Sequence, residues 1–329
     1  MTDVAKPRQR DAAPARPGWQ VVLYRPETMT FVLLVLGMFG ASALSPYFLD
    51  VSYILDSFTL SAEFAMVALV LTMVIICGEI DLSPASNMAL SACLFAWAQS
   101  AGVPMPIAIV IGLASGVVMG AINGVFVIVL QLPSIIVTIG TLTLYRGIAQ
   151  VIAGDKSIRV PEWFIGINNV IVLGMPFTVL LFLILSLVLG LVLGTTVYGR
   201  QIYLIGTNEI AAQHAGIGTK RIKMSLFLAM GLASSIAGLL TASRLGSVRY
   251  DLGLGGELQM VLMAMLGGTY IFGGRGTILG TFLAAWLLVV ASTGMTVANL
   301  LPAVQLTVLG ILLIVSIIAT NFIYSRTRR

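Results

Sequence analysis

The sequence predicts an all-α polytopic membrane protein with about ten transmembrane helices and with both termini in the cytoplasm. Of its 329 residues, 58% are hydrophobic and only 9% are charged, whereas a typical soluble domain carries about 25% charged residues. Apolar runs long enough to cross a bilayer core of roughly 30 Å recur along most of the chain. The predicted spans are 28–44, 62–77, 84–101, 106–130, 134–153, 170–194, 224–242, 257–272, 277–296 and 302–323.

The two ends of the chain predict its orientation. Residues 1–27 combine cations with prolines and precede an apolar run too long for a signal peptide, so we expect a disordered cytoplasmic tail. With an even number of crossings through the transmembrane domain 28–323, most of the 18 lysines and arginines and the tail 324–329 lie in the cytoplasm. The net charge of +5 therefore indicates topology, with lipid rather than nucleic acid as the partner.

The longest polar interruption between predicted spans is the cytoplasmic loop 195–223. An asparagine in it can cap a short helix, the following glutamate then lies where the helix dipole favours an anion, and two glycines can end the helix. We expect about two helical turns, EIAAQHAG, displayed at the membrane surface for a partner protein. The candidate partner-binding residues are Asn208, Glu209, Ala211, Ala212, His214, Ala215 and Gly216.

Motifs for catalysis or metal binding do not occur in the sequence. There is no G-x-x-x-x-G-K-[ST] motif, so this chain has no P-loop for ATP. A single histidine cannot form a metal site or a catalytic triad. We therefore expect no catalytic residue, metal or cofactor, and any ATP that drives the protein must bind a separate subunit.

Polar residues within the apolar part are candidates for a translocation path. Glu79 and Asp81 lie between two predicted spans, just before Ser83 and Pro84. They mark either a helix boundary at the inner interface or a broken helix that lines a cavity, because charges inside a bilayer are costly and functional by default.

Arg146 is the basic residue that falls within a predicted span. Its side chain either extends to the outer interface or points into a passage with hydroxyl, amide and aromatic groups of the kind that bind sugars. The candidate path residues are Glu79, Asp81, Asn123, Thr138, Thr141, Tyr145 and Arg146.

Four stretches together resemble the permease subunits of bacterial ABC sugar importers of the ribose, xylose and rhamnose type, and the related permeases for a furanosyl autoinducer. The resemblance covers nearly the whole chain from residue 28 onward. The four stretches are GEIDLSPASNMALSA, LPSIIVTIGTLTLYRGIAQVIAG, YGRQIYLIGTNEIAAQHAGI and MLGGTYIFGGRGTILGT.

The resemblance implies an inner-membrane subunit that works with cytoplasmic ATP-binding subunits, a second permease and a periplasmic sugar-binding protein. It also implies that 198–218 is the coupling loop and that 209–216 docks into the ATPase. Where the family usually reads G-G-I-D-L-S-x-G-S, this chain has Glu79 for the second glycine and Ala85 for the later one.

The resemblance favours import of a monosaccharide, with a rhamnose-like deoxysugar as the first choice and the furanosyl autoinducer as the alternative. In both of those subgroups two different permeases work together, so we expect a homologous heterodimer. A less favoured alternative is an ion-coupled secondary transporter in which Glu79 and Asp81 carry protons or sodium.

Overall fold

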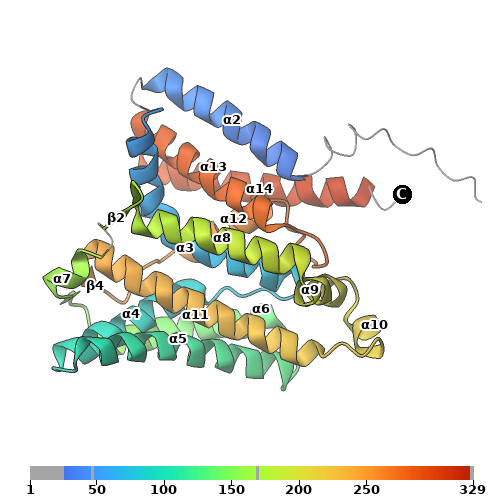
Figure 1. Cartoon of the computed structure of the whole chain (residues 1–329), viewed down its shortest axis with the longest axis horizontal. Helices are drawn as coiled ribbons and strands as arrows, with labels where there is room; N and C mark the ends of the chain where they lie inside the picture. Colours follow the sequence, from blue (N-terminus) through green and yellow to red (C-terminus); the bar gives the residue numbers. More distant parts are fainter. Residues whose placement is uncertain (1–25, 46–47, 168–169, 327–329) are drawn as a thin grey trace, which may run out of the picture.

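Long helices lie side by side along the longest axis of the molecule (Figure 1) in a computed structural model that describes residues 26–45, 48–167 and 170–326. The long helices are α2 (Pro26–Leu44), α3 (Val51–Ile76), α4 (Pro84–Ser100), α5 (Met105–Ile128), α6 (Ser134–Ala153), α8 (Phe177–Thr195), α11 (Thr219–Leu245), α13 (Ile278–Val297) and α14 (Pro302–Arg326). The short helices are α7 (Glu162–Ile165), α9 (Val197–Thr207), α10 (Glu209–His214) and α12 (Gly256–Leu266). Most of the predicted tails 1–27 and 324–329 lies outside the described residues, while 26–27 begin α2 and 324–326 end α14.

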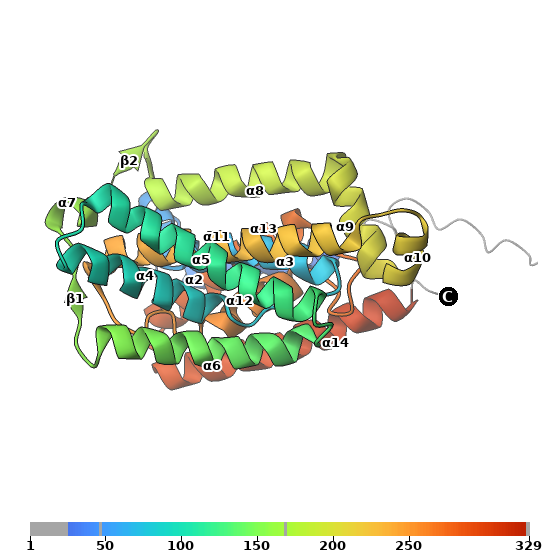
Figure 2. The ribbon, with the colours of Figure 1, turned by 90° about the horizontal axis from the view of Figure 1, so that it is seen from below.

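The bundle has two distinct ends. Strands β1 (Ile158–Arg159) and β4 (Ser247–Val248) pair antiparallel at the end that carries α7, which we call the α7 end (Figure 1). Helices α9 and α10 project from the opposite end, the α10 end, as Figure 2 also shows. The described chain also starts and ends there, because α2 begins and α14 finishes on the α10 side (Figure 1).

The polytopic all-α class predicted from composition is confirmed. Within the described residues, eight helices are long and apolar enough to cross a membrane, namely α2, α3, α5, α6, α8, α11, α13 and α14. The predicted spans 84–101 and 257–272 correspond to α4, with 17 residues, and α12, with 11. At about 1.5 Å per residue α12 covers roughly half of a bilayer core, so the predicted count of ten crossings stays a prediction.

Three predicted boundaries are wrong for physical reasons. Helix α3 starts at Val51 rather than at 62, because the Asp50 side chain accepts a hydrogen bond from the Ser52 amide and caps it. Helix α8 starts at Phe177 rather than at 170, because 170–176 is occupied by the paired strands β2 (Ile171–Val172) and β3 (Met175–Pro176). Helix α12 stops at Leu266, where two glycines follow and Gly268 takes a φ of 84°.

The most extensive helix packing joins α5 to α11. Four glycines of α5 recur at every fourth position, 112, 116, 120 and 124, so they share one face of that helix. A Cβ atom on Gly120 would collide with the Phe227 carbonyl, and one on Gly231 would collide with the Gly116 carbonyl. Small residues let the backbones of membrane helices approach this closely, so this stripe fixes α11 against α5.

We expect Gly231→Leu to destabilise the bundle by about 2 kcal/mol, because the added side chain has no space between α11 and α5. Gly140→Leu is the matched control, since no atom lies within 4 Å of a Cβ built at that helical glycine. Unfolding in mixed detergent micelles measures both variants. An equal loss of stability in the two would contradict the packing argument.

Candidate functional site

The chain between α3 and α4 is a non-helical segment, 77–83, inside the bundle. Helix α3 ends there because Gly78 takes a φ of 94°, while the Gly78 amide donates to the Ile75 carbonyl and the Glu79 amide donates to the Val74 carbonyl. Irregular backbone at membrane depth is tolerated only where protein satisfies its polar groups. The sequence at this point therefore breaks the helix and then restarts it at Pro84.

Helix α6 supplies partners for this irregular backbone. The Ile80 amide donates to Ser134 Oγ at 3.1 Å, and the Thr138 hydroxyl donates to the Ile80 carbonyl at 3.3 Å. Both polar groups of the Ile80 backbone are thus satisfied by side chains of a helix more than 50 residues away. Thr138, one of the predicted path residues, fixes the position of segment 77–83.

Segment 77–83 ends in a buried polar cluster, which we define as Asp81, Ser83, Asn123 and Tyr145. Asp81 Oδ1 accepts from the Ser83 amide at 2.8 Å and from its hydroxyl at 2.7 Å. Asn123 Nδ2 donates to Ser83 Oγ at 2.8 Å, and the Tyr145 hydroxyl donates to Asn123 Oδ1 at 3.1 Å and to the Met119 carbonyl at 3.0 Å. Asp81, Asn123 and Tyr145 are each at most 2% exposed.

The structure thus brings together three of the predicted path residues, Asp81, Asn123 and Tyr145, from three separate elements. Segment 77–83 separates the end of α3 from the start of α4 at Pro84, and its place on a translocation path stays a prediction. Thr141 is buried one turn along α6, where its hydroxyl donates to the Thr138 carbonyl at 3.4 Å.

Arg146 lies away from this cluster. Its guanidinium donates two hydrogen bonds of 2.7 Å to the carbonyls of Tyr250 and Leu252, which belong to the loop between β4 and α12. Its side chain thus fastens α6 to a loop near the α7 end. The role of Arg146 in a passage beside Thr138 stays a prediction.

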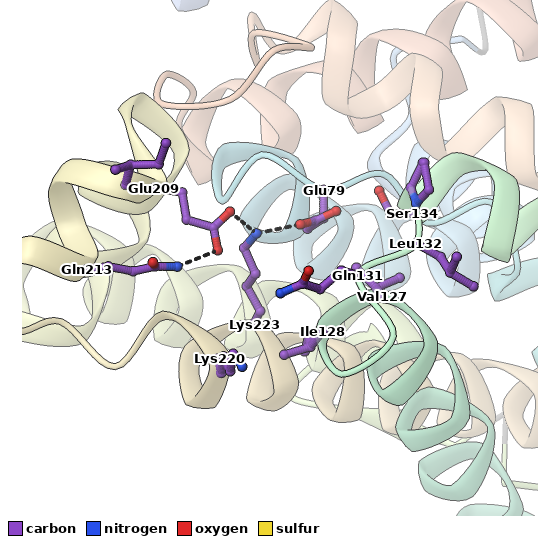
Figure 3. A pocket seen from close by; sticks show the side chains of 12 residues that line it. Glu79, Val127, Ile128, Gln131, Leu132, Ser134, Glu209, Gln213, Lys220 and Lys223 are labelled. Carbon is purple, nitrogen blue, oxygen red and sulfur yellow. Dashed lines mark hydrogen bonds and ion pairs between the residues drawn. The ribbon is translucent and has the colours of Figure 1, made fainter.

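Glu79 has a different partner from Asp81. It lies at the α10 end, where Lys223 Nζ contacts Glu79 Oε1 and Glu209 Oε2, each at 2.6 Å (Figure 3). Lys223 belongs to α11 and Glu209 to α10, so this three-residue ion cluster joins three elements. Gln213 adds a longer hydrogen bond of 3.4 Å to Glu209 Oε1.

The ion cluster lies on the wall of a cavity of about 430 Å³ between α10, α11 and the turn from α5 to α6 (Figure 3). Carboxylate, ammonium, amide and hydroxyl groups on this wall can hydrogen-bond a polar solute. The lining residues are Glu79, Val127, Ile128, Gln131, Leu132, Pro133, Ser134, Glu209, Ile210, Gln213, Lys220 and Lys223.

Helix α10 has the cap predicted from sequence. The Asn208 side chain accepts a hydrogen bond from the Ala211 amide at 3.0 Å, and Gly216 takes a φ of 79° in the turn that follows. Ala212 faces the bundle and is buried. The other candidate contact residues leave a surface open to solvent, with Ala211, His214, Ala215 and Gly216 exposed.

Sequence reasoning missed two buried ion contacts. Lys223 was read as one of several loop cations, although it is only 8% exposed. Glu63, in the middle of α3, pairs with Arg244 of α11 at 2.8 Å and is buried. The signal that could have found this pair is a carboxylate inside an apolar run, which requires a partner.

Metal ligands do not gather in this structure. Across the described ranges 26–45, 48–167 and 170–326, no group of three or more His, Cys, Asp or Glu residues could hold a metal ion.

A bundle of apolar helices long enough to cross a membrane, with a broken helix inside it, is the architecture of a polytopic membrane protein. Residues 53–317 match the family described as branched-chain amino acid transport system, permease component, and the chain belongs to this family. It is thus a multi-pass permease of an ABC importer in the bacterial inner membrane, not itself catalytic, and such an import system includes ATPase and binding-protein partners.

Among its relatives, the chain is similar to proteins named autoinducer 2 import system permease protein LsrD. The examples from Escherichia coli strains HS and K12 and from Shigella flexneri are each 34% identical over 313 residues, which is 93% of this chain and 93% of the relative. No solved structure matches. The resemblance seen in the four sequence stretches is therefore confirmed at the level of the family.

We expect Tyr145→Phe to destabilise the protein by about 1 kcal/mol, because it leaves the buried Asn123 carbonyl oxygen without its donor. Thr143→Val is the control on the same helix, since the exposed Thr143 hydroxyl bonds only to the Ile139 carbonyl one turn away. Thermal unfolding of the detergent-solubilised protein compares the two. A larger loss for Thr143→Val would show that the cluster does not hold α5 and α6 together.

Proposed function

We propose that this chain is a permease subunit through which an ATP-driven importer moves an autoinducer-2-like furanosyl molecule into the cell. The observation that carries the proposal is the similarity to autoinducer 2 import permeases over 93% of the chain. The names of these relatives support the alternative drawn from sequence, the furanosyl signal, better than the rhamnose-like sugar that was placed first.

The proposed orientation puts the α10 end in the cytoplasm, with ten crossings made by the eight long apolar helices together with α4 and α12. Three cations, Arg200, Lys220 and Arg221, are exposed at the α10 end. The α7 end carries three exposed cations as well, Lys156, Arg159 and Arg249. The excess expected on the cytoplasmic side therefore comes from the sequences of the two tails, which contain Lys6, Arg8, Arg10, Arg16, Arg25, Arg326, Arg328 and Arg329. Both tails then lie inside the cell and α7 faces the periplasm.

In this orientation α10 is the element that docks into the ATPase. Its exposed side, from Asn208 to Gly216, offers one small amphipathic helix held rigidly by its cap and by the ion cluster. The loops at the α7 end then meet the periplasmic binding protein. A homologous second permease completes the transporter, because the furanosyl-autoinducer permeases that this chain resembles work as two different subunits.

Within the bundle, segment 77–83 and the buried polar cluster lie where a polar solute must pass between apolar helices. Among the other predicted path residues, Thr138 holds the segment and Glu79 lines the 430 Å³ cavity. Thr141 extends the polar side of α6, while Arg146 stabilises the outer loop. We propose that this arrangement lets the segment shift without exposing unpaired backbone groups to lipid.

Uptake of labelled autoinducer 2 into proteoliposomes should require internal ATP, the ATPase subunits, the second permease and the binding protein. Rhamnose offered in the same assay with the same binding protein should not be taken up. Uptake by this chain alone, or uptake abolished by an ionophore at constant ATP, would instead favour the ion-coupled transporter.

We expect Gly216→Pro to abolish stimulation of the ATPase by the loaded binding protein while the chain still inserts into the membrane. Proline fixes φ near −65°, whereas Gly216 needs a φ of 79° to turn from α10 into α11. Gly216→Asn is the matched control, because asparagine tolerates positive φ and no atom lies within 4 Å of the added Cβ. Normal stimulation in the proline variant would remove α10 from the docking role.

A further inference from the structure

Lys223 is the only residue of the described chain whose side chain makes ion pairs with two different elements at once. It lies in the second turn of α11 and reaches Glu79 after α3 and Glu209 on α10, both at 2.6 Å. Only 8% of Lys223 is exposed. A buried ammonium that loses its partners is left uncompensated, so all three elements are held in one arrangement.

The contact continues from Glu79 into the bundle. The next residue, Ile80, is bound through both its backbone groups to Ser134 and Thr138 of α6. Asp81 and Ser83 then join the buried polar cluster with Asn123 of α5. A displacement of Glu79 therefore acts on a segment whose other end is fixed to α5 and α6.

A second contact ties the same region to α9. A Cβ on Gly206 would collide with the Ile76 carbonyl, and a Cβ on Gly273 would lie 2.9 Å from the Cα of Gly78. The Gly274 amide donates to the Ile76 carbonyl at 2.8 Å. Gly206 of α9 and the turn 273–274 after α12 thus both pack backbone to backbone against 76–78 at the end of α3.

Residues 76–80 are therefore held by two sets of contacts. Glycines of α9 and of the turn after α12 pack against 76–78, and the ion cluster joins Glu79 to α10. The unit formed by α9 and α10 cannot move relative to the bundle unless 76–80 moves with it or the ion cluster opens. Charged groups in such a buried contact make short, geometrically specific hydrogen bonds. A displacement of α10 is therefore expected to displace segment 77–83 through the ion cluster.

We propose that Lys223 is a positioning residue that couples α10 to segment 77–83, so that displacement of α10 by the ATPase moves the segment and its polar cluster. The proposal rests on the docking role of α10 given above. Lys223 acts here through Glu79 and Glu209. Spatial continuity alone does not establish coupling, so the test is a mutant cycle.

The measured quantity is the amount of substrate imported per ATP hydrolysed by the complete transporter in proteoliposomes. We expect Lys223→Met to lower this ratio several-fold, and Glu79→Gln to lower it less. The double variant should match Lys223→Met alone, because both changes open the same contact. Lys223→Arg, which keeps the charge, should recover part of the ratio.

Arg221→Met is the matched control, because Arg221 is exposed two residues before Lys223 on α11 and lies outside the ion pairs found in the described residues. It should leave the ratio unchanged. An unchanged ratio in Lys223→Met, or effects of Lys223→Met and Glu79→Gln that multiply, would overturn the proposal. Thermal unfolding of each variant identifies a simple loss of stability, which lowers the amount of active transporter but not the ratio.

Co-purification with the ATPase subunits separates this inference from the proposed function. If the unaltered chain neither retains the ATPase nor imports with ATP, the docking role of α10 fails. If it does both, and Lys223→Met also retains the ATPase with an unchanged ratio, the docking role stands and only the coupling through Lys223 fails. If Lys223→Met retains the ATPase but hydrolyses ATP with little import, the coupling is supported.

Discussion

Hydrogen bonding of backbone groups away from water is the constraint on which this structure depends. A chain in lipid can interrupt its helices only where protein satisfies the freed amides and carbonyls. Segment 77–83 meets this requirement with hydroxyls of α6, and the turn after α12 meets it by donating from Gly274 to the Ile76 carbonyl. The two interruptions pack against each other, so the irregular backbone at the α10 end is held in place by direct backbone contacts.

Glycine residues make a second contribution to the stability of the bundle, because they let helices pack closely. The stripe of four glycines on α5 lets α11 approach until backbone meets backbone. The same helix carries Asn123 to the start of α4, where its amide donates to Ser83. One face of α5 therefore supplies both the close packing and a member of the buried polar cluster. The same packing fixes the position of α11, and with it the position of Lys223 at the α10 end.

Much of the fold is predictable because helix length, caps and glycine stops are local properties. The Asn208 cap, the break after α3 and the nearness of Asn123 to Tyr145 on polar helix faces agree with the sequence. The contacts of Lys223 with Glu79 and of Arg244 with Glu63 join residues 144 and 181 positions apart, and no local pattern selects such partners. The partners of Arg146 are equally hard to predict from sequence, since its acceptors are carbonyls that any residue could supply.

The Lys223 ammonium group forms ion pairs with two carboxylates at the junction of α10 with the bundle. Glu79 and Glu209 are thus rivals for a shared counter-ion as well as joint ligands of it, and their like charges repel each other across the lysine. Any event that draws the lysine toward one carboxylate weakens its contact with the other, so the contacts of α11 with α10 and with segment 77–83 depend on each other.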